Sequence, residues 1–165
     1  MIRTVWKDIC PKEIGHAQCH EHIWLEKGAS YNTSPALCMN DYKSSLKELK
    51  DYRQAGGSLI VDAQPTGCGR NLSRLAELSR ESGVHIVAAA GFHKKEFFDQ
   101  VTLLTWSKEK LAGLYAQEIE TGTGTSGRPV SLYRAGILKA AAGRNWQTDP
   151  VYQKPFEAVA EAAGR

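Results

Sequence analysis

Short runs of apolar residues alternate along the chain with longer segments in which apolar residues recur every three or four positions. Runs of the first kind are typical of strands that are buried on both faces of a parallel sheet. The predicted strands span residues 17–23, 58–63, 85–90 and 135–140, and the first of them is the least apolar.

The segments between these runs have helical periodicity and recognisable ends. The last helix is the best marked, because Asp149 can cap it, Pro150 suits its first turn, and an apolar stripe that includes Phe156 and Val159 follows. The predicted helices span residues 41–55, 71–82 and 107–121, and the fourth begins at Asp149.

Strand and helix therefore alternate four times, which predicts an α/β fold with a parallel sheet and right-handed crossovers. Two architectures share this order. One is a doubly wound open sheet, and the other is a (β/α)8 barrel, which needs eight units and typically about 250 residues. The order of elements alone favours the open sheet for a chain of 165 residues.

Composition narrows the function classes. With 42% hydrophobic and 24% charged residues, the chain has the make-up of one globular domain with a real core. The net charge of +3 is spread among acids without a dense basic run, which argues against nucleic acid as a partner. No stretch resembles a signal peptide or a membrane span, so we expect a cytoplasmic protein. The four cysteines are widely spaced, which predicts reduced and mostly buried thiols.

The first predicted strand carries the triplet His20-Glu21-His22. Residues two apart on a strand point to the same face, so both imidazoles can hold one metal ion. Catalytic divalent metals favour imidazole nitrogen. The alternative is that two histidines fall at this spacing by chance as ordinary polar residues at a strand edge, because short motifs without context often mislead.

A lysine, Lys139, lies within the apolar run of the fourth predicted strand. Burial disfavours the charged ammonium, and a neutral amine can react with carbon dioxide to give a carbamate that bridges two metal ions. The alternative is that Lys139 lies at the strand end and extends its amine to water. The pattern alone favours that alternative.

Several segments, in order over nearly the whole chain, closely resemble the phosphotriesterase family of the amidohydrolase superfamily, which includes phosphotriesterases and lactonases. They are residues 13–23, 57–63, 67–70, 82–87 and 134–139. The resemblance reverses the preference for an open sheet. It implies a (β/α)8 barrel of the metal-dependent hydrolase type, with residues 1–165 forming about the first four βα units, a half-barrel within a single barrel domain that stops after about the fourth helix.

By this resemblance, His20 and His22 look like ligands of the more buried metal ion, and Lys139 looks like the carboxylated lysine that bridges two divalent ions. The metals implied are usually zinc, with manganese or cobalt as alternatives. The mechanism that the resemblance implies is attack by a metal-activated hydroxide on the lactone carbonyl or the phosphoester of a small-molecule substrate. This agrees with the way paired metals lower the pKa of water and stabilise an oxyanion.

The family places two further histidines on strands 5 and 6 and an aspartate on strand 8, whereas this chain ends at Arg165. His16 and His85 are poor substitutes, because each precedes or begins its predicted strand, away from the expected site. We therefore expect the 165-residue chain to be incomplete for catalysis and weak or inactive alone.

Two segments are candidates for substrate binding. His93, Lys94 and Lys95 follow the third predicted strand, where barrel loops form the active face, and could meet an anionic group such as the phosphate of a sugar lactone. The alternative is a solvated basic loop. By the resemblance, lactonases of the family place an aromatic residue near this position, so His93 departs from their pattern and argues against simple hydrophobic lactones as substrates. The turn of residues 67–70 places Arg70 near the expected mouth of the site.

Two other functions remain open at this point. A non-catalytic half-barrel could self-associate into a homo-oligomer through its unpaired sheet edges. A nucleotide-binding open α/β domain could use the glycines of residues 67–70 to hold phosphate, although the turn lacks the third glycine of a dinucleotide motif and the Gly-Lys-Ser/Thr of a P-loop.

Overall fold

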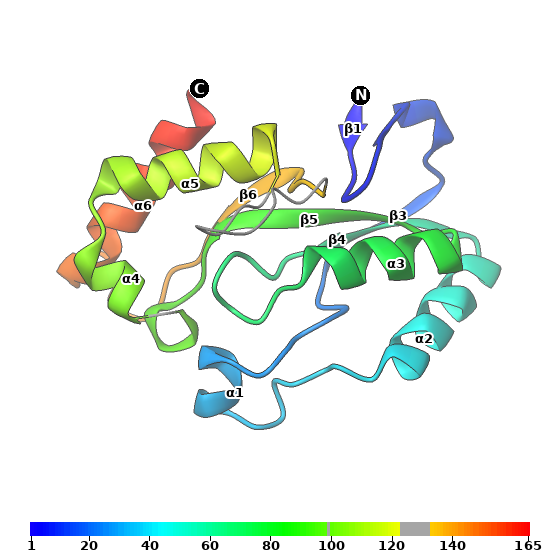
Figure 1. Ribbon diagram of the computed structural model, residues 1–165, viewed down its shortest axis with the longest axis horizontal. Helices are drawn as coiled ribbons and strands as arrows, with labels where there is room; N and C mark the ends of the chain where they lie inside the picture. The colour runs from blue at the N-terminus through cyan, green and yellow to red at the C-terminus, as the bar shows by residue number, and fades with distance from the viewer. Residues whose placement is uncertain (99, 123–132) are drawn as a thin grey trace.

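The computed structural model describes residues 1–98, 100–122 and 133–165. Its main sheet has four parallel strands whose spatial order follows the chain (Figure 1). They are β3 (His16–Glu21), β4 (Gly57–Asp62), β5 (His85–Phe92) and β6 (Ile137–Ala140). A doubly wound sheet reverses its strand order at a switch point, whereas a barrel adds each new strand beside the last. The observed order is that of a barrel.

Each of these strands is followed by one of the four predicted helices, and the four correspond to within a residue or two at each predicted end. They are α2 (Tyr42–Gln54), α3 (Leu72–Ser82), α5 (Lys108–Glu120) and α6 (Pro150–Ala163). In every case the residue before the helix accepts a hydrogen bond from a backbone N–H of the first turn. These caps are the side chains of Asp41, Asn71, Ser107 and Asp149.

The structure adds short elements that the periodicity does not predict. An antiparallel pair, β1 (Ile2–Arg3) and β2 (Asp8–Ile9), opens the chain. The others are η1 (Pro11–Glu13), α1 (Ala29–Thr33), η2 (Lys95–Phe97) and α4 (Gln100–Thr105). Between β1 and β2, the Val5 N–H donates to the Ile86 carbonyl oxygen over 2.7 Å, and the Val5 carbonyl accepts from the Arg134 N–H. The N-terminal segment is thereby tied to the start of β5 and to the segment before β6.

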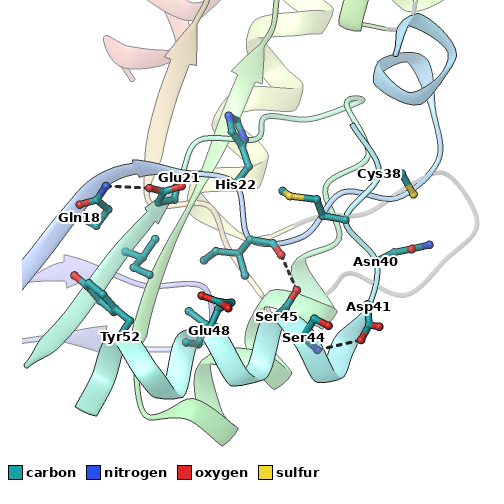
Figure 2. Close-up of a pocket in the computed structure, with 14 residues that line it drawn as sticks. Gln18, Glu21, His22, Cys38, Asn40, Asp41, Ser44, Ser45, Glu48 and Tyr52 are labelled. Carbon is teal, nitrogen blue, oxygen red and sulfur yellow. Dashed lines mark hydrogen bonds between the residues drawn. The ribbon is translucent and has the colours of Figure 1, made fainter. Parts of the chain in front are cut away.

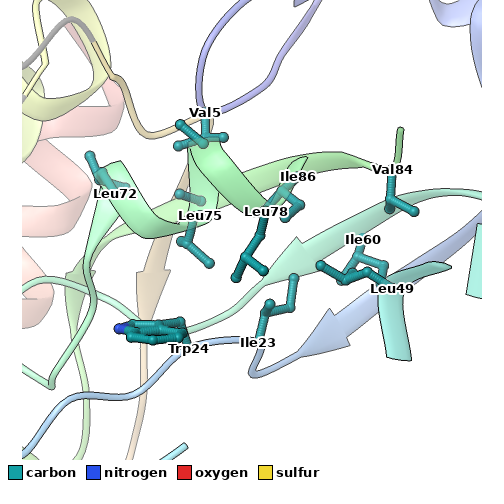
Figure 3. Packing of buried hydrophobic residues seen from close by; sticks show 12 residues of the cluster. Val5, Ile23, Trp24, Leu49, Ile60, Leu72, Leu75, Leu78, Val84 and Ile86 are labelled. Carbon is teal, nitrogen blue, oxygen red and sulfur yellow. The ribbon is translucent and has the colours of Figure 1, made fainter. Parts of the chain in front are cut away.

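The largest apolar cluster lies between the sheet and the helices α2 and α3 (Figure 3). Leu75, Leu78 and Ile86 are fully buried within it, each contributing roughly 1.5–3 kcal/mol to the free energy of unfolding. A second cluster joins α5 to α6 around Leu111 and Tyr115. These two clusters lie on the helix-covered side of the sheet. A smaller cluster lies on the other face, where Ile9 of β2 packs against Leu59 of β4 and Val87 of β5.

Burial differs sharply between the inner and outer strands. All but one residue of β4 and all but one of β5 are buried, as the apolar runs predict. β3 and β6 are the outermost strands of the sheet; β3 is almost wholly exposed, and none of the residues of β6 is buried. Burial on both faces was therefore a wrong prediction for the outer strands, because an edge strand has a neighbour on one side only. Of the helices that the structure describes, none is long and apolar enough to cross a membrane.

Candidate metal and substrate site

The two histidines of the His20-Glu21-His22 triplet lie at the carboxyl end of β3, where the strand finishes at Glu21. Their ring centroids are 5.5 Å apart and the rings meet edge to face. His20 is exposed, whereas His22 is partly buried and its Nδ1 atom is enclosed without a hydrogen-bond partner among the described residues. Burial, together with the nearby charge of Lys139, lowers the pKa of His22. The ring is thus held in the neutral form that can ligate a metal.

Lys139 lies on β6 opposite Gly91 of β5, and its side chain reaches across to β4. There Nζ donates a hydrogen bond of 2.6 Å to the Ala63 carbonyl oxygen. Burial lowers the pKa of the Lys139 amine, although the thiol of Cys68 and the carboxyl of Asp62 act in the opposite direction. The lysine is therefore neither extended into solvent nor paired with a carboxylate by a direct ion pair among the described residues.

Asp62, the last residue of β4, is a site residue that sequence reasoning missed. Its side chain is fully buried, and its two oxygens accept hydrogen bonds of 2.9 Å from the Ile23 and Gln64 N–H groups. Burial raises the pKa of Asp62 to about 6, while the hydrogen bonds from backbone amides lower it. The sequence does contain a signal for this residue. Asp62 lies within an apolar run, as Lys139 does, and a charged residue in a buried strand needs a partner.

His93 follows β5 directly and lies at the same end of the sheet as the other two imidazoles. The Lys94 N–H donates to its Nδ1 atom over 2.7 Å, so in the neutral ring the proton is on Nε2. The ring also meets Phe97 edge to face at 5.1 Å. Burial, followed by the charges of Lys139 and His22, lowers the pKa of His93 to about 4. His93 therefore presents a neutral N–H donor at neutral pH.

This assignment of charge to His93 is testable by titration of its ring. We expect the His93 imidazole signals to stay those of the neutral Nε2–H form from pH 8 down to pH 5, because the pKa lies near 4. The measurement is ¹H–¹⁵N NMR of the histidine rings, with the His93 signals assigned from a His93→Gln variant. A ring that gains its second proton above pH 6 would contradict the assignment.

The three basic residues predicted to meet substrate lie in different surroundings. Lys94 is close enough to His93 and Lys139 for its charge to lower the pKa of both. Lys95 forms an ion pair with Asp149, the cap of α6. The Arg70 side chain is 5% exposed and pairs with Glu118 at 2.8 Å, while its other terminal nitrogen donates to the Ala89 carbonyl. The charges of Lys95 and Arg70 are thus each paired within the chain, without a substrate, and the roles of these residues in substrate binding remain predictions.

The glycine turn that precedes Arg70 is packed against the chain. Gly67 and Gly69 have φ angles of 77° and 86°, and a Cβ on Gly69 would lie 2.5 Å from the Glu26 carbonyl oxygen. The Glu26 N–H also donates to the Gly69 carbonyl over 2.8 Å. Glycine is therefore required by the backbone conformation and the close approach of two chain segments, which explains the turn without a bound phosphate.

His16 and His85 lie at the amino ends of β3 and β5, as expected, and so away from the triplet. All four cysteines are free thiols, but only Cys68 is buried and Cys19 is exposed, so the prediction that most of them are buried is wrong. Burial raises the pKa of the Cys68 thiol to about 12, so this cysteine is inert at neutral pH.

The residues present fit part of a metal site. His22 offers an enclosed ring nitrogen without a partner among the described residues, His20 lies beside it, and Lys139 has an amine shifted toward its neutral form. Across the parts of the chain that the structure describes, three or more His, Cys, Asp or Glu side chains nowhere gather closely enough to hold a metal ion. A third ligand from these residues would therefore have to be a modified Lys139.

A pocket of about 770 Å³ lies between β3, residues 38–41 and α2 (Figure 2). Its wall combines apolar side chains with the carboxylates of Glu21, Asp41 and Glu48. His22 borders it, whereas His20, His93 and Lys139 do not. Figure 2 shows His22 projecting away from the helix that carries Ser44, Ser45 and Glu48. The pocket and the candidate metal site are therefore neighbours that share one residue.

The family comparison agrees with this geometry. The model of the phosphotriesterase family matches residues 1–165, the full length of the sequence. The chain belongs to the phosphotriesterase family. A phospho-furanose lactonase of Mycoplasmopsis agalactiae is 30% identical in an alignment 151 positions long, which covers 86% of this chain and 43% of the relative. An N-acetyltaurine hydrolase of Danio rerio is 26% identical over 99% of this chain and 53% of the relative. The chain thus spans about half the length of these relatives.

A solved structure confirms the fold. The crystal structure of an amidohydrolase from Mycoplasma synoviae superposes with a TM-score of 0.88 at 29% identity, over 98% of this chain and 48% of that one. The four βα units are accordingly a half-barrel of the family's (β/α)8 type. The prediction of a barrel, made from the resemblance against the order of elements, is confirmed.

Proposed function

We propose that this protein is a metal-dependent hydrolase of the lactonase and phosphotriesterase kind, in which His20, His22 and a carboxylated Lys139 hold divalent metal. The observation that carries the proposal is the meeting of two imidazoles and a lysine of lowered pKa at the carboxyl ends of the parallel strands. This is the end at which barrel enzymes build their active sites. The relatives named as lactonase and hydrolase support the reaction class.

The lysine must first be neutral to take up carbon dioxide. Its amine nitrogen then attacks the carbon of CO2, an N–C bond forms, and one proton is released to solvent. Burial favours the neutral amine that this step needs. The hydrogen bond from Nζ to the Ala63 carbonyl oxygen holds the nitrogen near β4, so the new carboxylate would form close to the imidazoles of β3.

Divalent ions at this site, when bound, supply a Lewis acid and activate water at neutral pH. The chain's own residues position the substrate beside them. His93, whose Nε2 carries the proton, can donate a hydrogen bond to a substrate oxygen, and the ring stays neutral because its pKa is about 4. Lys94 adds positive charge next to it. A substrate with an anionic oxygen, such as a phosphorylated sugar lactone, suits this pair best.

The metal proposal is tested by elemental analysis of the purified chain after reconstitution with zinc and bicarbonate. We expect near-stoichiometric metal in the native chain and background levels in a His20→Ala/His22→Ala variant, because both imidazole ligands are lost. Lys139→Ala should lower the metal content and abolish a ¹³C-carbamate NMR signal from labelled bicarbonate. His16→Ala is the matched control, since this imidazole lies at the other end of β3 and should leave metal content unchanged.

A native chain that holds no metal under these conditions would sink the proposal. Concentration-dependent assembly without metal would instead support the alternative of a non-catalytic, self-associating half-barrel, for which the exposed β3 edge offers a surface. Metal bound through His20 and His22 would justify a screen of phosphorylated lactones, phosphotriesters and N-acyl amides. Binding of a phosphorylated lactone that weakens in His93→Gln would support the hydrogen bond assigned to that ring.

A further inference from the structure

We propose that Asp62 is a positioning residue that sets the place of His22 relative to Lys139. The inference rests on the proposed metal site, and it concerns the way this chain holds the two ligands together. Asp62 contacts neither ligand side chain through a hydrogen bond of its own. It acts through the backbone on both sides of the site.

The backbone ladder alone does not hold His22. The pairing of β3 with β4 is irregular between Gln18 and Glu21, the stretch that contains His20. Its last register pair is Glu21 with Asp62, and both strands end there. His22 therefore lies just beyond the regular sheet, where a chain normally gains freedom.

One oxygen of the Asp62 carboxylate replaces the missing ladder on this side. Oδ2 accepts a hydrogen bond of 2.9 Å from the N–H of Ile23, the residue that follows His22. The bond is buried, and the carboxylate has no exposed surface. Hydrogen bonds from backbone N–H groups to a buried carboxylate are stronger than those between neutral groups. The segment that carries His22 is thus fastened to the end of β4.

The other oxygen acts on the lysine side. Oδ1 accepts a 2.9 Å hydrogen bond from the Gln64 N–H, which fixes the peptide group that follows Ala63. That residue is joined to β3 through its N–H, which donates to the Glu21 carbonyl over 2.8 Å. Its carbonyl oxygen accepts the 2.6 Å hydrogen bond from Lys139 Nζ. One side chain therefore fixes both the histidine segment and the carbonyl that receives the lysine.

The Asp62→Asn variant tests the hydrogen bonds of Asp62 without changing the shape of its side chain. The Asp62→Asn side chain has nearly the same volume, but only one of its two terminal atoms can accept a hydrogen bond. Its NH2 group would face either the Ile23 or the Gln64 N–H, and two donors repel. One side of the site should then lose its anchor while the strand itself persists.

The test compares ¹⁵N-labelled native chain, Asp62→Asn and a control, Glu118→Gln. Glu118 is also a buried carboxylate, but its partners are Arg70 and Thr66. We expect Asp62→Asn to raise amide exchange at Ile23 or Gln64 at least about tenfold and to shift the ring signals of His22. Cobalt affinity should fall about 10–100-fold, as for other residues that orient metal ligands. Glu118→Gln should lower thermal stability without moving the His22 signals.

The exchange and ring measurements need no metal, so they decide the inference separately from the proposed function. If the native chain binds no cobalt, the metal site is wrong, and a shifted His22 ring in Asp62→Asn would still establish the positioning role. Unchanged exchange and unchanged His22 signals in Asp62→Asn would overturn it. So would equal shifts of the His22 ring in Glu118→Gln, because the effect would then be a general loss of stability.

Discussion

Replacing Gly91 with alanine is expected to destabilise the fold by about 4 kcal/mol. Gly91 lies on β5 with a φ angle of 114°, a conformation that alanine reaches only with strain of about 1–3 kcal/mol. A Cβ at this position would also lie 2.0 Å from the Lys139 carbonyl oxygen on β6. Since that atom belongs to the backbone, relief requires moving a strand, and overpacking of this kind costs about 1–3 kcal/mol more.

Urea unfolding followed by circular dichroism measures this change in the free energy of unfolding. The matched control is Gly113→Ala in α5, where a Cβ has no neighbour within 4 Å. That variant should be more stable than the native chain by about 0.5–1 kcal/mol, because alanine is the better helix former. A Gly91→Ala chain with the native unfolding midpoint would show that β6 does not approach β5 in solution as it does in the structure.

Removing the carboxylate of Glu118 should have an effect of similar size for a different reason. Its side chain is 3% exposed and pairs with Arg70 at 2.8 Å, and Thr66 donates to its second oxygen over 2.5 Å. Glu118→Ala leaves the Arg70 guanidinium buried without its partner, which costs about 3–5 kcal/mol. The pair joins the loop after β4 to α5, so its loss should also loosen the contact between these two parts of the chain.

A double variant tests whether the lost charge partner is the cause. Arg70→Met/Glu118→Leu replaces both charges with apolar groups and should recover most of the lost stability, as buried pairs often allow. The control is Asp51→Ala, which breaks an exposed ion pair: the side chain of Lys47 is 72% exposed and that of Asp51 is 53% exposed. This variant should leave the unfolding midpoint unchanged. Equal losses in Glu118→Ala and the double variant would contradict the charge argument.

The βα units of this fold could be predicted from local sequence signals. The four main strands and the four main helices stand close to where the apolar runs, the caps and the helix-ending glycines place them, since those signals act within a few residues. The N-terminal strand pair and the short α1 and α4 have too few periodic positions to be recognised. The exposure of β3 depends on which strand is at the edge, and periodicity carries no information on that.

The candidate site was less predictable, because its parts come from four strands. His20 and His22 are recognisable from their spacing, and Lys139 from its apolar surroundings. The role of Asp62 is visible only once the ends of β3 and β4 are side by side. The burial of Arg70 likewise follows from a helix nearly fifty residues away in sequence, on which Glu118 lies. Contacts between residues this far apart in the sequence depend on the tertiary structure, and local sequence patterns do not predict them.

The sequential strand order also determines when the site is assembled during protein synthesis. Each new strand adds beside the one made before it, so the sheet can grow from its first βα unit while the ribosome is still at work. At the usual rate of elongation, Lys139 leaves the ribosome on the order of ten seconds after His20 and His22. His20 and His22 are therefore synthesised before Lys139, and the site becomes complete only when β6 pairs with β5.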